Sequence, residues 1–130
     1  MQKNSQKNKN RPKNLNLFTI RLPINALVSI LHRASGMALF AMLPLILLAF
    51  QYSARSQQSY TKLVALFDTW FIKLMLVGLA WAFSHHFFAG LRHLLQDSHW
   101  MASLQKTRLS SRVVLWLVGI SVAIFSFVVW

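Results

Sequence analysis

A group of polar residues near the start of the chain lies inside an apolar stretch. Ser29, His32, Arg33 and Gly36 are spaced at i, i+3, i+4 and i+7, so they share one face of a helix. An arginine within a membrane helix costs roughly 2.5–3.5 kcal/mol on insertion scales, so it is kept where it faces protein, a cofactor, a ligand or water. The chemistry available on this face is hydrogen-bond donation and positive charge. We therefore expect the working site here.

A second group of residues that could do chemistry surrounds two adjacent histidines, His85 and His86. Imidazole is the usual intramembrane ligand for haem iron, through a neutral ring nitrogen. Adjacent residues point about 100° apart on a helix, so at most one of the two faces a given site. The stripe through the second histidine is made of small residues and histidines, which a flat macrocycle can approach: Gly78, Ala82, His86, Ala89, Gly90 and His93. The stripe through the first is bulky: Trp81, His85, Phe88 and Arg92. His86 is the better ligand candidate.

Two alternatives to this haem hypothesis stay open at the level of residues. Small residues also allow two helices to pack closely, with a histidine hydrogen-bonded between them. Alternatively, His32 and His86 could both ligate the iron, although the adjacent pair His32 and Arg33 suits contact with haem propionates better.

Three apolar stretches are long enough to cross a bilayer, which takes about 20 residues in a helix. They cover about residues 24–50, 69–95 and 113–130. The third has no charge and only two serines, whereas each helix of a compact soluble protein needs a polar stripe. We predict an all-α membrane protein, with three transmembrane helices in a single anchor domain over residues 1–130. An amphipathic segment at 60–68 is expected along the outer surface, and residues 97–112 are expected to form a loop.

The placement of the basic residues predicts the orientation of these helices. Most of the net charge of +12 comes from residues before the first span and around the second loop: Lys3, Lys7, Lys9, Arg11, Lys13, Arg21, Arg92, Lys106, Arg108 and Arg112. The first loop has only Arg55 and Lys62. The positive-inside rule then puts the basic segment 1–21 and the second loop in the cytoplasm, and the carboxyl terminus in the periplasm. Topology and a lipid membrane explain this charge better than nucleic acid, which we do not expect as a partner.

The chain has no cysteine, which excludes disulfides, thiolate metal sites, iron–sulfur ligation and covalent haem attachment. The first twenty residues contain no apolar run, so no cleaved signal peptide is expected. They also lack acidic residues, as a mitochondrial presequence does, but they carry Asn and Lys where Arg and Ser would be expected. These features favour a bacterial inner-membrane protein.

Two multi-residue signatures follow one another along the chain. The first comprises Arg11-Pro12, Asn14-Leu15, Arg21, Pro23 and Ser29-Ile30-Leu31-His32-Arg33-Ala34-Ser35-Gly36. The second runs from His86 through Gly90-Leu91-Arg92-His93 to Asp97. Together they resemble the cytochrome b subunit of succinate dehydrogenase, the larger of two membrane anchors in bacterial complex II. The resemblance covers about residue 11 to the end, and departs from the pattern at the membrane edge, at Lys13, Gln96 and His99.

The resemblance implies a role for each matched residue. His86 would be one axial ligand of haem b, and a second small anchor subunit would supply the other. Ser29 and Arg33 would help form the ubiquinone site with the iron–sulfur subunit and the small anchor. His32 and Arg33 would approach the haem propionates, and His93 would lie near the haem edge. Asp97 could aid proton uptake, or could form an ordinary interfacial ion pair.

The implied function is to anchor the flavoprotein and iron–sulfur subunits of succinate dehydrogenase within a haem-binding helix bundle. Electrons from succinate would pass through those subunits to ubiquinone, and this chain alone would oxidise nothing. Two rival functions remain. One is a haem-bearing anchor of a fumarate reductase that runs in the opposite direction. The other is a non-catalytic membrane subunit whose histidines and arginine only pack against a partner helix.

Overall fold

The computed structural model describes residues 21–98 and 103–130. Within them the chain forms four α-helices: α1 (Ile24–Ser53), α2 (Gln57–Phe67), α3 (Trp70–Asp97) and α4 (Leu104–Val129). Three of these, α1, α3 and α4, are long and apolar enough to cross a membrane. The predicted all-α fold with three candidate transmembrane helices is therefore confirmed. Most of the basic segment 1–21, with the motif residues Arg11-Pro12 and Asn14-Leu15, lies outside the described residues, as does His99.

The beginnings of the helices are fixed by local sequence. Pro23 has extended backbone angles, and its carbonyl accepts the first bonds of α1 from the N–H groups of Ala26 and Leu27, at 2.9 and 3.2 Å. Ser103 caps α4, because its hydroxyl accepts a hydrogen bond from the Lys106 N–H at 3.3 Å. This cap starts α4 at Leu104, well before residue 113 where the apolar span was expected. Much of the expected loop 97–112 is therefore helix.

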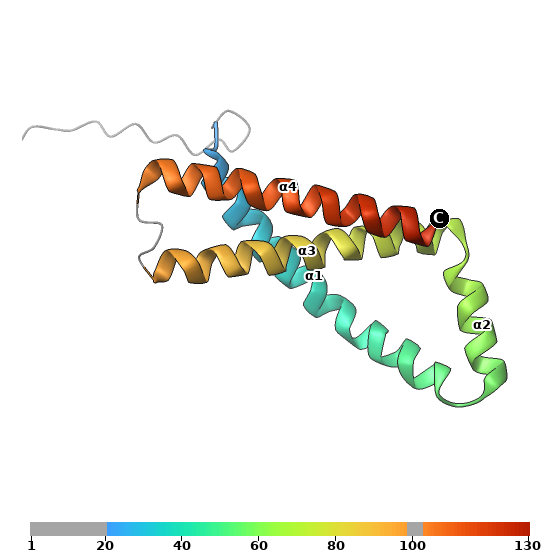
Figure 1. Cartoon of the computed structure of the whole chain (residues 1–130). Helices are drawn as coiled ribbons and strands as arrows, with labels where there is room; N and C mark the ends of the chain where they lie inside the picture. Colours follow the sequence, from blue (N-terminus) through green and yellow to red (C-terminus); the bar gives the residue numbers. More distant parts are fainter. Residues whose placement is uncertain (1–20, 99–102) are drawn as a thin grey trace, which may run out of the picture.

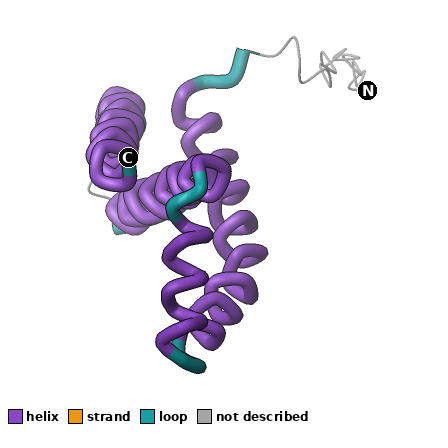
Figure 2. The backbone as a smooth tube through the Cα atoms, turned by 90° about the vertical axis from the view of Figure 1, so that its right-hand side faces the viewer, coloured by secondary structure: helices purple, strands orange, loops and turns teal. Residues whose placement is uncertain are grey.

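The helix α3 lies between α4 and α1 (Figures 1 and 2). It runs antiparallel beside α4, while α1 crosses it and diverges from it toward α2 (Figure 1). The beginning of α1, the end of α3 and the beginning of α4 lie at one end of the molecule. The helix α2 and the carboxyl terminus lie at the other end. The long helices thus run from one end of the molecule to the other in alternating directions, as three successive membrane crossings require.

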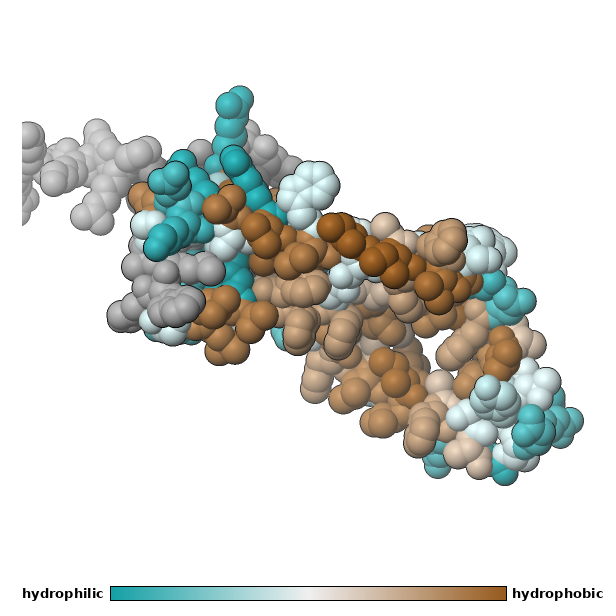
Figure 3. Space-filling view, in the orientation of Figure 1, coloured by the Kyte–Doolittle hydropathy of each residue, from teal (hydrophilic) through white to brown (hydrophobic). Residues whose placement is uncertain are grey.

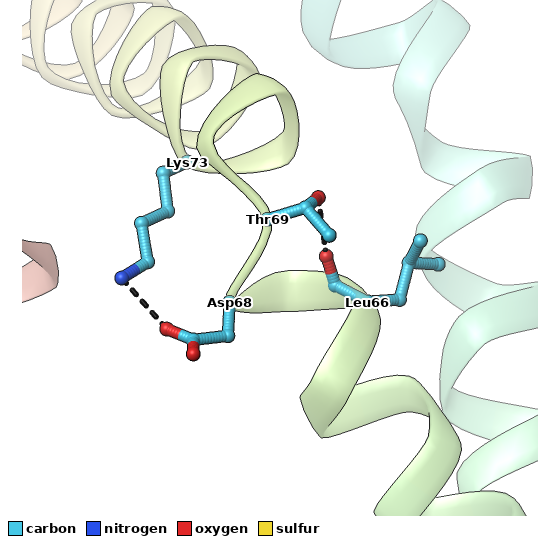
Figure 4. Close-up of polar contacts among 4 residues, drawn as sticks. All are labelled: Leu66, Asp68, Thr69 and Lys73. Atoms are coloured by element: carbon cyan, nitrogen blue, oxygen red, sulfur yellow. Dashed lines mark hydrogen bonds and ion pairs between the residues drawn. The ribbon is translucent and has the colours of Figure 1, made fainter.

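The connection from α2 to α3 is held by local polar contacts at the α2 end of the molecule (Figure 4). Lys73 forms an ion pair with Asp68 at 2.7 Å, and the Thr69 hydroxyl donates a hydrogen bond to the Leu66 carbonyl at 2.7 Å. The Lys73 ammonium holds the pKa of the Asp68 carboxyl below its usual value. The amphipathic segment predicted at 60–68 thus corresponds to most of α2 and its C-cap residue Asp68.

The surface is apolar between polar ends, as a membrane environment requires (Figure 3). Large apolar side chains are exposed along the long helices, among them Phe40, Trp116 and Phe127. The buried core is small, and most of its residues have short side chains: Val28, Ala82, Ala89, Val114 and Val118. An apolar cavity of about 710 Å³ lies between α1, α2 and α3, and Ser53 is the only polar residue in its lining. That cavity has almost nothing to orient a polar ligand.

Candidate functional site

Three of the predicted site residues meet where α1 crosses α3. The imidazoles of His32 on α1 and His86 on α3 are stacked, with ring centroids 4.3 Å apart and an interplanar angle of 4°. His93, two turns further along α3, has its ring centroid 5.1 Å from that of His32. The structure therefore brings both predicted signatures together at one place, although they lie more than 50 residues apart in the sequence.

The His86 ring is oriented by a hydrogen bond to α1. Its Nδ1 lies 3.1 Å from the backbone carbonyl oxygen of His32. A carbonyl oxygen only accepts, so Nδ1 carries the proton and Nε2 carries the free lone pair. A histidine that ligates a metal usually donates its other ring N–H to a carbonyl or carboxylate in this way. His86, with a hydrogen-bonded Nδ1–H and a free lone pair on Nε2, therefore fits an axial ligand of haem iron.

Two glycines allow the imidazoles to approach the opposite helix. A Cβ atom added at Gly36 would lie 2.8 Å from Cε1 of His86, and one added at Gly90 would lie 3.2 Å from Nε2 of His32. By contrast, a Cβ added at Gly78 would meet nothing within 4 Å. The small residues at positions 36 and 90 thus accommodate histidines of the neighbouring helix.

The stacked arrangement bears on the hypothesis that His32 and His86 both ligate one iron. Two axial ligands point at the metal from opposite faces of the macrocycle. Parallel rings with centroids 4.3 Å apart leave no space for a macrocycle between them. In this arrangement His32 and His86 are not a bis-histidine pair. Within the described part of the chain, no group of three His, Cys, Asp or Glu side chains could hold a metal ion by itself.

Ser29 and Arg33 lie on α1 next to this histidine cluster. Ser29 is half-buried and Arg33 is exposed. Neither side chain hydrogen-bonds to any residue in the ranges 21–98 and 103–130. Their hydroxyl and guanidinium donors are therefore available to a group outside the described residues. On the face predicted to be shared by Ser29, His32, Arg33 and Gly36, His32 and Gly36 approach residues of α3.

Asp97 is exposed at the last residue of α3, one turn beyond His93. The alternative considered for it, an interfacial ion pair, is not formed within the described ranges, where the one ion pair joins Lys73 and Asp68. Arg92 instead turns toward α4. It is 4% exposed, and it donates hydrogen bonds to the Ser110 hydroxyl at 3.1 Å and to the Thr107 carbonyl at 3.3 Å.

His85 is the site residue that the sequence did not assign. It lies with Ala82, Ala89 and Arg92 on the fully buried face of α3. Its Nε2 is 3.3 Å from the carbonyl oxygen of Val28, and its ring stacks on Trp81 with centroids 5.6 Å apart. His85 therefore enters the helix interface together with Ala82 and Ala89, two alanines that the sequence had grouped with His86. The available signal was the pair of alanines three residues before and four residues after it.

The chain is similar to known membrane subunits. Residues 7–125 match the family described as the succinate dehydrogenase/fumarate reductase transmembrane subunit. The chain is 33% identical over 125 residues to a succinate dehydrogenase cytochrome b556 subunit from Coxiella burnetii, covering 95% of this chain and 99% of that protein. It is 31% identical over 106 residues to the subunit of the same name from Paracoccus denitrificans, covering 82% of each. The chain belongs to the family of succinate dehydrogenase/fumarate reductase transmembrane subunits.

Proposed function

We propose that this chain is the haem-bearing anchor of a succinate dehydrogenase. In this proposal it binds haem b together with a second small anchor subunit, and it holds the iron–sulfur and flavoprotein subunits at the membrane. It also completes the site where ubiquinone is reduced with electrons from succinate. The names of its relatives favour this direction over fumarate reduction. The basic end carrying Arg21, Lys106 and Arg112 would face the cytoplasm of a bacterial inner membrane.

The observation that carries the haem proposal is the hydrogen bond from His86 Nδ1 to the His32 carbonyl. It fixes the ring and leaves Nε2 as the donor atom for iron. When bound, the haem would supply one-electron redox chemistry. This chain would supply one ligand. The side chains of His32, Arg33 and His93 provide donors and positive charge that suit the propionates or the haem edge.

The quinone proposal rests on Ser29 and Arg33. Both have donors without a partner in the described chain, on the helix that also carries His32. Their hydroxyl and guanidinium can donate hydrogen bonds to quinone carbonyl oxygens, and the positive charge stabilises negative charge that develops there. Asp97, exposed at the last residue of α3, would deliver protons from the aqueous side.

Substitutions at these two positions test the quinone role in the purified complex. Ser29→Ala and Arg33→Leu should lower succinate:quinone reductase activity, while succinate oxidation with an artificial acceptor continues. Arg33→Leu should be the more severe, because it removes a charged donor and Ser29→Ala removes a neutral one. Ser53→Ala, at the opposite end of α1, is the matched control. Normal quinone reduction by assembled Ser29→Ala and Arg33→Leu complexes would remove both residues from the site.

A further inference from the structure

His85 occupies its position at an energetic cost. The side chain is 0% exposed. Its Nε2 must carry the proton, because its partner at 3.3 Å is the Val28 carbonyl, which only accepts. Nδ1 is then a bare acceptor, and it has no hydrogen-bond partner in the described residues. A buried, unpaired acceptor is destabilising, and a phenylalanine would fill the same space without one. The Nε2 hydrogen bond is therefore the feature that distinguishes His85 from an apolar residue.

The two adjacent histidines together contact two successive turns of α1. His85 bonds to the carbonyl of Val28 and His86 bonds to the carbonyl of His32. These carbonyls are four residues apart, so they lie on one side of α1. A single hydrogen bond leaves two helices free to pivot about it, whereas two bonds one turn apart oppose both pivoting and sliding. Because His32 stacks on His86, any sliding would also disturb that stack.

We propose that His85 is a positioning residue that sets the register of α3 against α1. Through that register it fixes the orientation of the His86 ring and the position of Ser29, which directly follows Val28. The inference rests on the proposed function, since it assigns His86 to haem and Ser29 to quinone. His85 itself touches neither group in this proposal. Trp81 stacks on its ring, and Ala82 and Ala89 are buried on the same helix.

Three substitutions at position 85 separate the hydrogen bond from the packing. His85→Phe keeps an aromatic ring of similar size without the donor. His85→Gln places an amide N–H near the position of Nε2, and His85→Asn places one near Nδ1, which has no partner in the structure. The exposed residue Phe83 on the same helix provides a control variant, Phe83→Leu. Each variant is studied in the whole complex at equal subunit content.

The measurements are the haem midpoint potential, the reduced-haem spectrum, and KM and kcat for quinone. His85→Phe and His85→Asn should shift the potential and the spectrum. They should also raise KM for quinone about twofold to tenfold, the range that one net hydrogen bond represents, with artificial-acceptor activity unchanged. His85→Gln should restore wild-type values, and Phe83→Leu should not depart from them. If the His85→Phe complex does not assemble, the comparison of His85→Gln with His85→Asn tests whether the Nε2 hydrogen bond is needed.

Wild-type haem properties and quinone kinetics in both His85→Phe and His85→Asn would overturn the inference. So would a His85→Gln complex that resembles the Asn variant, because the Nε2 donor would then not matter. Failure of the proposed function is distinguishable from these results. It would show as a wild-type complex without a b-type haem or without quinone reductase activity, whatever residue stands at position 85.

Discussion

At the scale of single residues, the site depends on close approach between α1 and α3. The His86 imidazole reaches the backbone of α1 because position 36 has no side chain. The His32 imidazole lies over Gly90 for the same reason. From the sequence, Gly36 was a member of the polar face of the first span, and Gly90 belonged to a small-residue stripe that suits either a macrocycle or close helix packing. In the structure these two glycines receive histidines of the opposite helix.

A methyl group at position 36 should therefore disturb the histidine cluster. In Gly36→Ala the new Cβ would lie 2.8 Å from His86 Cε1, so the imidazole must move. Overpacking of this kind costs about 1–3 kcal/mol. We expect a lower melting temperature of the complex and an altered reduced-haem spectrum. Gly78→Ala is the control on α3, because its Cβ would meet no atom within 4 Å. Equal behaviour of the two variants would contradict the close packing at Gly36.

At the scale of elements, the sequence predicted the three long helices well and their contacts less well. Apolar length identifies a candidate membrane helix, and capping at Ser103 extends α4 further than apolar length indicates. The contacts that His85 and His86 each make with α1 could not be predicted from the sequence of α3 alone. Both histidines contact α1, and which carbonyls they reach depends on where α1 crosses α3. Spacing along a single helix contains no information about that crossing.

The contacts of Arg92 with α4 also could not be predicted from the sequence of α3 alone. Its place in the second signature suggested a polar helix end near His93 and Asp97. The structure turns its guanidinium to the Thr107 carbonyl and the Ser110 hydroxyl of α4. These acceptors lie in the segment that the sequence assigned to a loop. Because α4 already exists there as a helix, Arg92 can connect the ends of α3 and α4.

At the scale of the whole molecule, one end is formed by the start of α1, the end of α3 and the start of α4, and among the described residues it carries Arg21, Arg92, Lys106, Arg108 and Arg112. A reporter fused after Trp130 should therefore behave as periplasmic, and one inserted near Ser103 as cytoplasmic. Activity of paired reporters, one active only in the periplasm and one only in the cytoplasm, measures both positions. The reverse pattern would put this basic end of the molecule in the periplasm. It would thus contradict the proposed cytoplasmic docking of the partner subunits.

In the proposed function, His86 supplies a haem ligand through Nε2. The most direct measurement is the reduced-minus-oxidised absorption spectrum, with electron paramagnetic resonance of the oxidised haem, in wild-type and His86→Ala complexes of equal subunit content. The wild-type complex should show a reduced b-type band. His86→Ala should lose that band or change its position and the ligand signature, because one axial nitrogen is gone. An unchanged band and unchanged ligation in His86→Ala would contradict the assignment.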